Sequence, residues 1–366
     1  MPDHHVALNF LLLLAFIIAA AKGAGWLSLR LGQPAVLGEL LAGVILGPSL
    51  LDLLHLKPFA EEGTAAGVFL LANIGVVLLM FIAGLETDLE QMRRVGRVAV
   101  TAGAAGVVVP FLFGLAVILP FDFGIHKSAF MAMVLTATSV SITVQTLIEL
   151  RQLESKEGTT LLGAAVVDDV IALVVLSVFI AVSLGGGGLT GVALVVVRMA
   201  AFFVVAVFLG RLFGPALGRA GRAPVSEGLL AAVLLAVLAY AWSAEALGGV
   251  AAITGAYLAG VLVAHAGYRH EVEHRLKALT YALFVPIFFV SIGLQTNARA
   301  LALQDIPLAL LIILAAVVGK IIGCGAGARL AGFTGQEALR IGVGMISRGE
   351  VGLIIAALGL QTGLLH

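Results

Sequence analysis

Twelve stretches of this chain are apolar and long enough to form membrane-spanning helices, and this feature restricts the fold more than any other. A span needs about 20 mostly apolar residues, and backbone groups inside lipid must find hydrogen-bond partners within their own segment, which favours helices. We therefore expect an all-α polytopic membrane protein. The predicted spans cover residues 6–22, 34–51, 65–85, 97–119, 128–150, 160–184, 191–214, 226–247, 249–265, 277–294, 306–330 and 336–362.

The composition agrees with lipid as the main solvent. Hydrophobic residues make up 61% of the chain and charged residues 11%, whereas soluble domains carry about 25% charged residues. A soluble helical bundle of this size has too little interior to hide so much apolar surface. The formal net charge is zero, so nothing indicates nucleic-acid binding. The single cysteine, Cys324, allows neither an internal disulfide nor a thiolate metal site.

Lysine and arginine residues are distributed unevenly between the loops that join these spans. Counted in chain order, the odd-numbered loops hold fifteen of them and the even-numbered loops hold three. Loops rich in Lys and Arg stay in the cytoplasm. We therefore expect the N-terminus outside and, with twelve spans, the C-terminus at His366 outside as well.

Two short motifs of the first half recur in the second half. Residues 38–44 (GELLAGV) resemble residues 255–261 (GAYLAGV), and residues 84–88 (GLETD) resemble residues 293–297 (GLQTN). Matching segments lie an odd number of spans apart, so the two halves run in opposite directions, as in many secondary transporters. Chance likeness between glycine- and leucine-rich spans is the alternative for either match alone. The repeat also predicts a thirteenth span beyond His366.

Two adjacent acidic residues, Asp168 and Asp169, lie in the middle of the sixth predicted span among apolar neighbours. Charges at bilayer depth are costly and mark functional sites. Burial raises the pKa of a carboxyl group, so a buried carboxyl can hold either a proton or a hard cation, which is the competition that an exchanger needs. The alternative is a pair of structural salt bridges within the bundle.

A basic residue, Lys320, lies in the middle of the eleventh predicted span, too far from either end to reach water easily. It needs an anion, and the aspartate pair is available; backbone carbonyl groups are the alternative partners. Residues 136–141 are rich in hydroxyls, and residues 342–352 are rich in glycine and carry Arg348 and Glu350. Both segments can break a helix at mid-membrane and present half-helix ends to an ion.

The hydroxyl groups of residues 136–141 have a second interpretation, because Ser and Thr side chains often bond back to the preceding turn. We expect Arg348 and Glu350 to neutralise each other or the half-helix ends.

These residues resemble the cation:proton antiporter superfamily, specifically the NapA-type Na+/H+ antiporters, with NhaA and the Kef potassium efflux systems as more distant relatives. The similarity runs from about residue 10 to 362, and the paired aspartates with a later mid-span lysine are its most specific element. The matching stretches are Gly38–Gly43, Thr138–Ser139, Ala164–Asp169, Gly319–Lys320 and Arg348–Ile354.

The resemblance implies a fold and an architecture. The fold would be an NhaA/NapA-like inverted-repeat transporter with thirteen spans, twelve of them visible here, and two discontinuous crossing helices. Residues 1–366 would form one transmembrane domain: spans 1–2 and 8–9 a dimerisation or scaffold part, span 7 a linker, and spans 3–6 and 10–12 an ion-binding core. The core would slide against the dimer interface in an elevator form of alternating access. A homodimer in the lipid of a prokaryotic inner membrane is expected.

The resemblance also implies roles for individual residues. Asp169 would be the main carboxylate for Na+ and H+, with Asp168 also drawn on by the ion. Asp168 would pair with Lys320, a proton-coupled partner. Thr138 and Ser139 would lie at the unwound crossing of span five, and Arg348 with Glu350 would form a core ion pair. The expected function is electrogenic exchange of Na+ or Li+ for H+, with no enzymatic activity and no cofactor.

Other functions explain the residues less well. A K+/H+ antiporter or K+ efflux protein of the same superfamily is the nearest alternative, although Kef-type relatives usually lack the second aspartate. An intramembrane aspartyl protease needs facing aspartates from two helices, whereas neighbours on one helix point about 100° apart. A channel needs a selectivity filter, and none is evident in the sequence. A symporter for organic anions with the same fold is a further alternative.

Overall fold

The computed structural model describes residues 3–60, 63–87, 89–183, 188–222, 226–349, 351–352 and 355–356, and every regular element within them is a helix. The α-helices are α1 (Asp3–Arg30), α2 (Ala35–Leu46), α3 (Thr64–Glu86), α4 (Leu89–Ile118), α5 (Ile125–Val134), α6 (Val140–Glu149), α7 (Lys156–Ser183), α8 (Gly188–Gly210), α9 (Phe213–Arg222), α10 (Gly228–Ser243), α11 (Ala252–His265), α12 (Arg269–Leu279), α13 (Val285–Leu294), α14 (Ile306–Leu330) and α15 (Gly335–Gly344). Two π-helices, η3 (Ala244–Gly248) and η4 (Thr280–Phe284), continue α10 and α12. Short 3₁₀ helices are η1 (Leu53–His55), η2 (Leu119–Phe121), η5 (Ala298–Ala300) and η6 (Leu303–Asp305).

Eight helical segments within the described ranges are long and apolar enough to cross a membrane, by length and composition. They are His5–Arg30, Thr64–Glu86, Arg93–Phe121, Lys156–Leu176, Ala193–Gly210, Gly228–Gly248, Arg269–Ala300 and Leu303–Leu330. Three shorter apolar helices, α2, α6 and α11, fall within other predicted spans. The count of twelve spans stays a prediction, because part of the last predicted span lies outside the described residues.

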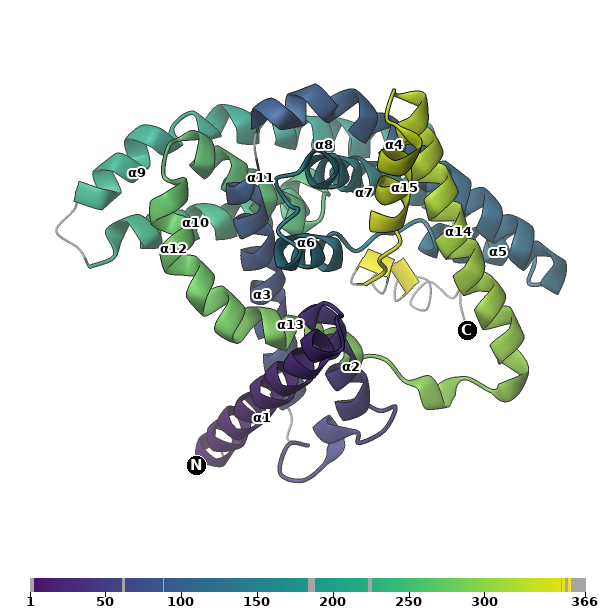
Figure 1. Ribbon diagram of the computed structural model, residues 1–366, viewed down its shortest axis with the longest axis horizontal. Coiled ribbons are helices and arrows are strands. Elements are labelled where there is room, and N and C mark those ends of the chain that lie inside the picture. The colour runs from purple at the N-terminus through teal and green to yellow at the C-terminus, as the bar shows by residue number, and fades with distance from the viewer. Residues whose placement is uncertain are drawn as a thin grey trace.

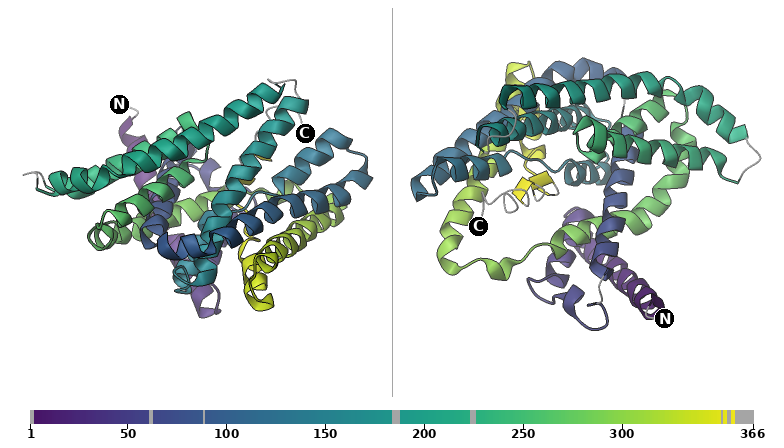
Figure 2. Two further views of the ribbon diagram at one scale, coloured as in Figure 1. Left: turned by 90° about the horizontal axis from the view of Figure 1, so that it is seen from above. Right: turned by 180° about the vertical axis from the view of Figure 1, so that it is seen from behind.

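Most of the helices pack into two groups (Figures 1 and 2). In the first, which we call the α4 group, α4 contacts α5, α7 and α14, and α15 packs on α14. In the second, the α3 group, α3 packs on α11 and α13, α2 packs on α1 and α13, and α10 packs on η3 and α11. α6 and α8 contact members of both groups.

The packing of α3 and α13 bears on the expected division of the chain, which stays a prediction. The sequence prediction placed spans three and ten with the ion-binding core, whereas the main packing partners of α3 and α13 are α11 and α2, which it placed in the scaffold.

Glycines let the helices of the α3 group approach closely. A Cβ on Gly84 of α3 would lie 2.1 Å from the carbonyl oxygen of Tyr257 in α11. A Cβ on Gly43 of α2 would lie 2.2 Å from the carbonyl oxygen of Val290 in α13. Small residues at such crossings allow backbone to touch backbone. Both glycines belong to the two motifs that recur in the sequence.

Candidate ion-binding site

Two interruptions of helix lie against each other. Residues 135–139 separate α5 from α6, and residues 346–349 after α15 are not helical. The Ser139 N–H donates to the Ser347 carbonyl over 2.9 Å, and Ser347 Oγ donates to the Ser139 carbonyl over 2.7 Å. Thr143 Oγ1 lies 2.7 Å from Ser347 Oγ. The segments that the sequence marked as breakable, 136–141 and 342–352, therefore meet at one crossing.

The Arg348 guanidinium binds carbonyls at the ends of α5 and α15 and one carbonyl within α14. Nη1 donates to the Ile346 carbonyl over 2.8 Å, and Nη2 donates to the carbonyls of Leu135 (3.0 Å) and Ala316 (3.3 Å). Carbonyl groups at a helix C-terminus lack partners within the helix and carry partial negative charge, so the cation stabilises the broken ends. The expected ion pair with Glu350 cannot be placed, because Glu350 lies outside the described residues.

A buried ion pair joins α7 to α14. Lys320 Nζ donates to Asp168 Oδ1 over 2.6 Å, and both side chains are 0% exposed. A glycine of α4 lies beside the pair: a Cβ on Gly106 would make ordinary contacts of 3.5 Å with Asp168 Oδ1 and with Lys320 Nζ, but would lie only 2.4 Å from the sulfur of Cys324. Any larger residue at 106 would press on this cysteine.

Two buried oxygen atoms near this pair have no hydrogen-bond partner within the described part of the chain. They are Asp168 Oδ2 and Thr138 Oγ1. Thr138 is 1% exposed and lies close enough to Asp168 to act on its charge. Buried polar atoms are normally paired, so two unpaired oxygens fit a place that receives a ligand. Carboxylate and hydroxyl oxygens are the donors that hard cations take.

Asp169 faces a different environment from its neighbour. It is 4% exposed and lines a cavity of about 600 Å³ between the two helix groups. From the α3 group, the walls come from α3, η3, α11 and α13; from the α4 group, they come from α7 and the described residues that follow α15. Asp169 and Glu245 are the charged side chains of the described lining, and Asn73 is a polar one. Asp168 thus contacts a lysine inside the α4 group, while Asp169 lies at the boundary between the groups.

A second cavity, of about 730 Å³, lies toward the other end of α7. Asp169 and Leu176 line the first cavity, whereas Glu157 and Leu161, nearer the start of α7, line the second. The second cavity also reaches Ser347 at the crossing. The two cavities therefore lie toward opposite ends of the same helix.

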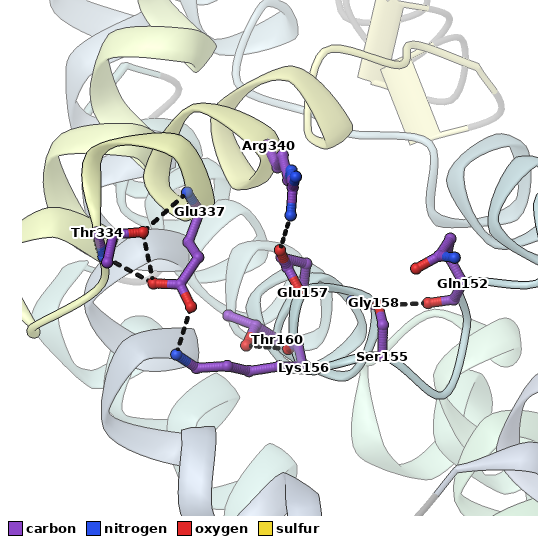
Figure 3. Close-up of polar contacts among 9 residues, drawn as sticks. All are labelled: Gln152, Ser155, Lys156, Glu157, Gly158, Thr160, Thr334, Glu337 and Arg340. Carbon is purple, nitrogen blue, oxygen red and sulfur yellow. Dashed lines mark hydrogen bonds and ion pairs between the residues drawn. The ribbon is translucent and has the colours of Figure 1, made fainter.

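Ion pairs fasten α7 to α15 beside the second cavity (Figure 3). Lys156 Nζ lies 2.7 Å from Glu337 Oε1, and Arg340 Nη1 lies 2.6 Å from Glu157 Oε1. Thr334 and Glu337 form a capping box at the start of α15. These contacts hold the starts of the two helices together within the α4 group.

Three residues that the structure brings to this region, Asn73, Glu245 and Gly106, were not predicted from the sequence. Asn73 carried a usable signal, because it is a polar residue in the middle of a predicted span. Glu245 lies near the end of the eighth predicted span, where a charge is ordinary. Gly106 is one of 45 glycines, and nothing in its neighbours marks it.

Comparison with known proteins identifies relatives over nearly the whole chain. The family described as sodium/hydrogen exchanger, transmembrane, matches residues 12–366. The probable Na+/H+ antiporter GerT of Bacillus cereus is 42% identical over 354 residues, which are 96% of this chain and 91% of GerT. The Na+/H+-K+ antiporter GerN of the same organism is 39% identical over 358 residues, covering 98% of this chain and 89% of GerN.

A solved structure shares the fold. The sodium proton antiporter MjNhaP1 of Methanocaldococcus jannaschii superposes with a TM-score of 0.69 at 15% identity, over 96% of this chain and 84% of that one. At this identity the likeness concerns the fold alone. The helical architecture with several membrane-length segments is therefore that of a multi-pass membrane protein.

Proposed function

This chain belongs to the sodium/hydrogen exchanger family, and we propose that it is a secondary active antiporter that exchanges Na+ or Li+ for H+ across a membrane. The main support for the proposal is that two adjacent carboxylates, Asp168 and Asp169, lie in different surroundings. Asp168 is buried in contact with Lys320, whereas Asp169 lines a cavity of about 600 Å³. One carboxylate that can take a proton or a cation from such a cavity provides coupled exchange.

The site for the cation would include both aspartates and the crossing. Asp169 receives the ion from the cavity, and the unpaired oxygens Asp168 Oδ2 and Thr138 Oγ1 are further donors. The backbone of the Ser139 segment is fixed by its bonds to Ser347, and Arg348 binds the carbonyl ends of the interrupted helices. The proposed chemistry uses no cofactor and forms no covalent intermediate.

The transport cycle that we favour is an elevator movement of the α4 group against the α3 group. The Asp169 cavity lies at the boundary of the two groups, and the second cavity, toward the other end of α7, reaches Ser347 at the crossing. The glycine contacts support an inverted repeat. Gly43 packs on α13 as its counterpart in the repeat, Gly260, packs on α3. This assignment moves α3 and α13 from the core to the scaffold.

The cellular setting belongs to the same proposal. The alternation of basic residues between loops supports an N-terminus outside, and bacterial relatives support a prokaryotic inner membrane. The apolar outer face of α8 supports contact with lipid or with a second copy in a homodimer, since Leu194, Val197, Val204 and Phe208 are all exposed.

Exchange of K+ for H+ is the second candidate. The specific observation in its favour is that the relative GerN, 39% identical to this chain, is an Na+/H+-K+ antiporter. Hard-cation selectivity depends on cavity size and ligand number, and both ions take the oxygen donors present here.

The test is exchange in proteoliposomes loaded at one pH and diluted into Na+, Li+ or K+ at another. The wild-type protein should collapse the pH gradient with Na+ or Li+, and Asp169→Asn should not, because an amide neither releases a proton nor balances a cation. Asp305→Asn removes a carboxylate that lines neither cavity and serves as the control. Near-wild-type exchange by Asp169→Asn would refute the site, and activity with K+ alone would favour the second candidate.

A further inference from the structure

A second acidic side chain, Glu245, lines the cavity that holds Asp169. It is exposed, and within the described parts of the chain no ion pair or hydrogen bond of its carboxylate is present. Most of the other side chains of the described lining are apolar, among them Val77, Leu176 and Phe288. A carboxylate in such surroundings attracts cations more strongly than one at an open surface, because low-dielectric walls focus its field.

The backbone around Glu245 is held in an unusual form. α10 continues at Ala244 into the π-helix η3, and Gly249, with φ +66°, ends it in the left-handed region that glycine adopts readily. π-helical turns are rare and often lie at functional sites. The η3 turn packs on α8, where a Cβ on Gly248 would lie 2.8 Å from Phe202. The close contact of Gly248 with Phe202 holds the η3 turn against α8.

The basic residue of the neighbouring helix α8, Arg198, does not bind the Glu245 carboxylate. Arg198 of α8 donates to the carbonyls of Leu247 (2.9 Å) and Ala246 (3.0 Å) at the end of η3. The guanidinium therefore binds carbonyl groups at the C-terminal end of η3, which lack partners within the helix and carry partial negative charge. Arg198 and Glu245 form no ion pair in the described structure, so the oxygens of the carboxylate stay available to a mobile cation.

Asn73 of α3 lines the same cavity and is exposed there. Its amide oxygen is a neutral donor of the kind that binds hard cations. Asn73 and Glu245 both belong to the α3 group, whereas Asp169 belongs to the α4 group. The cavity thus presents polar groups to an ion from both sides of the boundary along which the proposed movement occurs.

We propose that Glu245 and Asn73 form a recruitment site for the transported monovalent cation, which gathers hydrated ions in the cavity before they bind Asp169. This inference rests on the proposed antiport and adds to it a residue that sets the apparent affinity from one side of the membrane. Since Glu245 lies on the α3 group, the ion leaves it when Asp169 moves away. At low cation concentration, the site increases the rate at which cations bind Asp169. It takes no part in proton release.

The experiment compares Glu245→Gln with wild-type protein in vesicles of known orientation, using Na+ as the probe. For Na+ presented at the cavity side, the variant should show a KM raised roughly threefold to fivefold at low ionic strength and an unchanged maximal rate. For Na+ presented at the opposite side, KM should stay at the wild-type value. Added choline chloride should shrink the difference, because salt screens exposed charges.

Asp305→Asn is the matched control, because it removes one exposed carboxylate at the start of α14 that does not line the cavity. It should leave KM unchanged from both sides. Asn73→Ala should raise KM from the cavity side without the dependence on ionic strength, since it removes a neutral donor. An unchanged KM in Glu245→Gln, or an equal change from both sides, would overturn the recruitment site. A wild-type protein without exchange would instead overturn the antiport proposal.

Discussion

Lys320 Nζ lies 2.6 Å from Asp168 Oδ1, and neither side chain has any exposed surface. The two residues are 152 positions apart in the chain, and their contact joins α14 to α7. Removing both charges from water is costly, and their attraction compensates only when the geometry is good. The same pair therefore affects the stability of the protein and, in the proposed function, the number of protons exchanged.

The first prediction concerns stability. Lys320→Gln or Asp168→Asn alone should lower the free energy of unfolding by about 3–5 kcal/mol, because each leaves one buried charge without its partner. The double variant Asp168→Asn, Lys320→Gln should recover a large part of this loss, since neither charge remains. The stability of the three variants is compared by heating each in detergent and measuring, by size-exclusion chromatography, the fraction that remains folded. Losses that simply add in the double variant would show that the pair is not coupled.

The second prediction concerns competition between the ions. If one carboxylate, Asp169, binds both Na+ and H+, the apparent KM for Na+ should rise as the pH falls. The sign follows from linkage: the Na+-free state binds more protons, so acid stabilises it. Once the site is mostly protonated, release of the Asp169 proton alone should raise KM roughly tenfold per pH unit, and release of a second proton should make the rise steeper, toward roughly a hundredfold. Exchange assays from about pH 6 to 9 measure the slope, and a flat KM over this range would exclude a shared site.

Parts of the site could be predicted from sequence because charges inside apolar spans stand out. Lys320 lacks any route to water along its span, so a buried anion was its expected partner, and the structure has that contact. The interruption near Thr138 was expected from hydroxyl residues, and residues 135–139 are not part of α5 or α6. The roles of these residues in ion binding stay predictions.

Other features depend on contacts that a single sequence does not reveal. α3 and α13 pack with α2 and α11 because glycines that are remote in sequence allow the helices to approach closely. The hydropathy of a span does not indicate which other spans it contacts. Glu245 could not be predicted as a site residue, because the cavity wall that it shares with Asp169 is built from a different helix. The π-helical turn that holds it has no reliable sequence pattern.

The third prediction tests the packing of the α3 group. Gly84→Ala should destabilise the protein by roughly 1–3 kcal/mol, because its Cβ would lie 2.1 Å from a carbonyl oxygen of α11 and the helices must separate. Gly96→Ala in α4 is the matched control, since a Cβ there meets nothing within 4 Å. It should be neutral or stabilise slightly, because alanine favours helix. Equal melting temperatures for the two variants would argue against a tight α3–α11 contact.

The last prediction concerns stoichiometry. Without Na+, Lys320 is charged and paired with Asp168. A cation that binds Asp169 and draws on Asp168 Oδ2 weakens the counter-charge of the lysine, and a buried ammonium without a counter-charge loses its proton readily. Asp169 releases a second proton when it takes the cation. Two protons then exchange for one Na+, and each cycle moves one net charge.

A membrane potential should therefore drive the wild-type exchange, at about 2.3 kcal/mol per charge per 100 mV. The double variant Asp168→Asn, Lys320→Gln keeps only Asp169 as an exchangeable group, so any transport that survives should be electroneutral. Current recordings from proteoliposomes on a solid support measure both proteins under the same Na+ step. A wild-type exchange that produces no transient current and ignores an imposed potential would refute the second proton. In the double variant, Asp169 accounts for one exchanged proton only. If this variant still moves net charge, the second proton must come from a group other than Lys320.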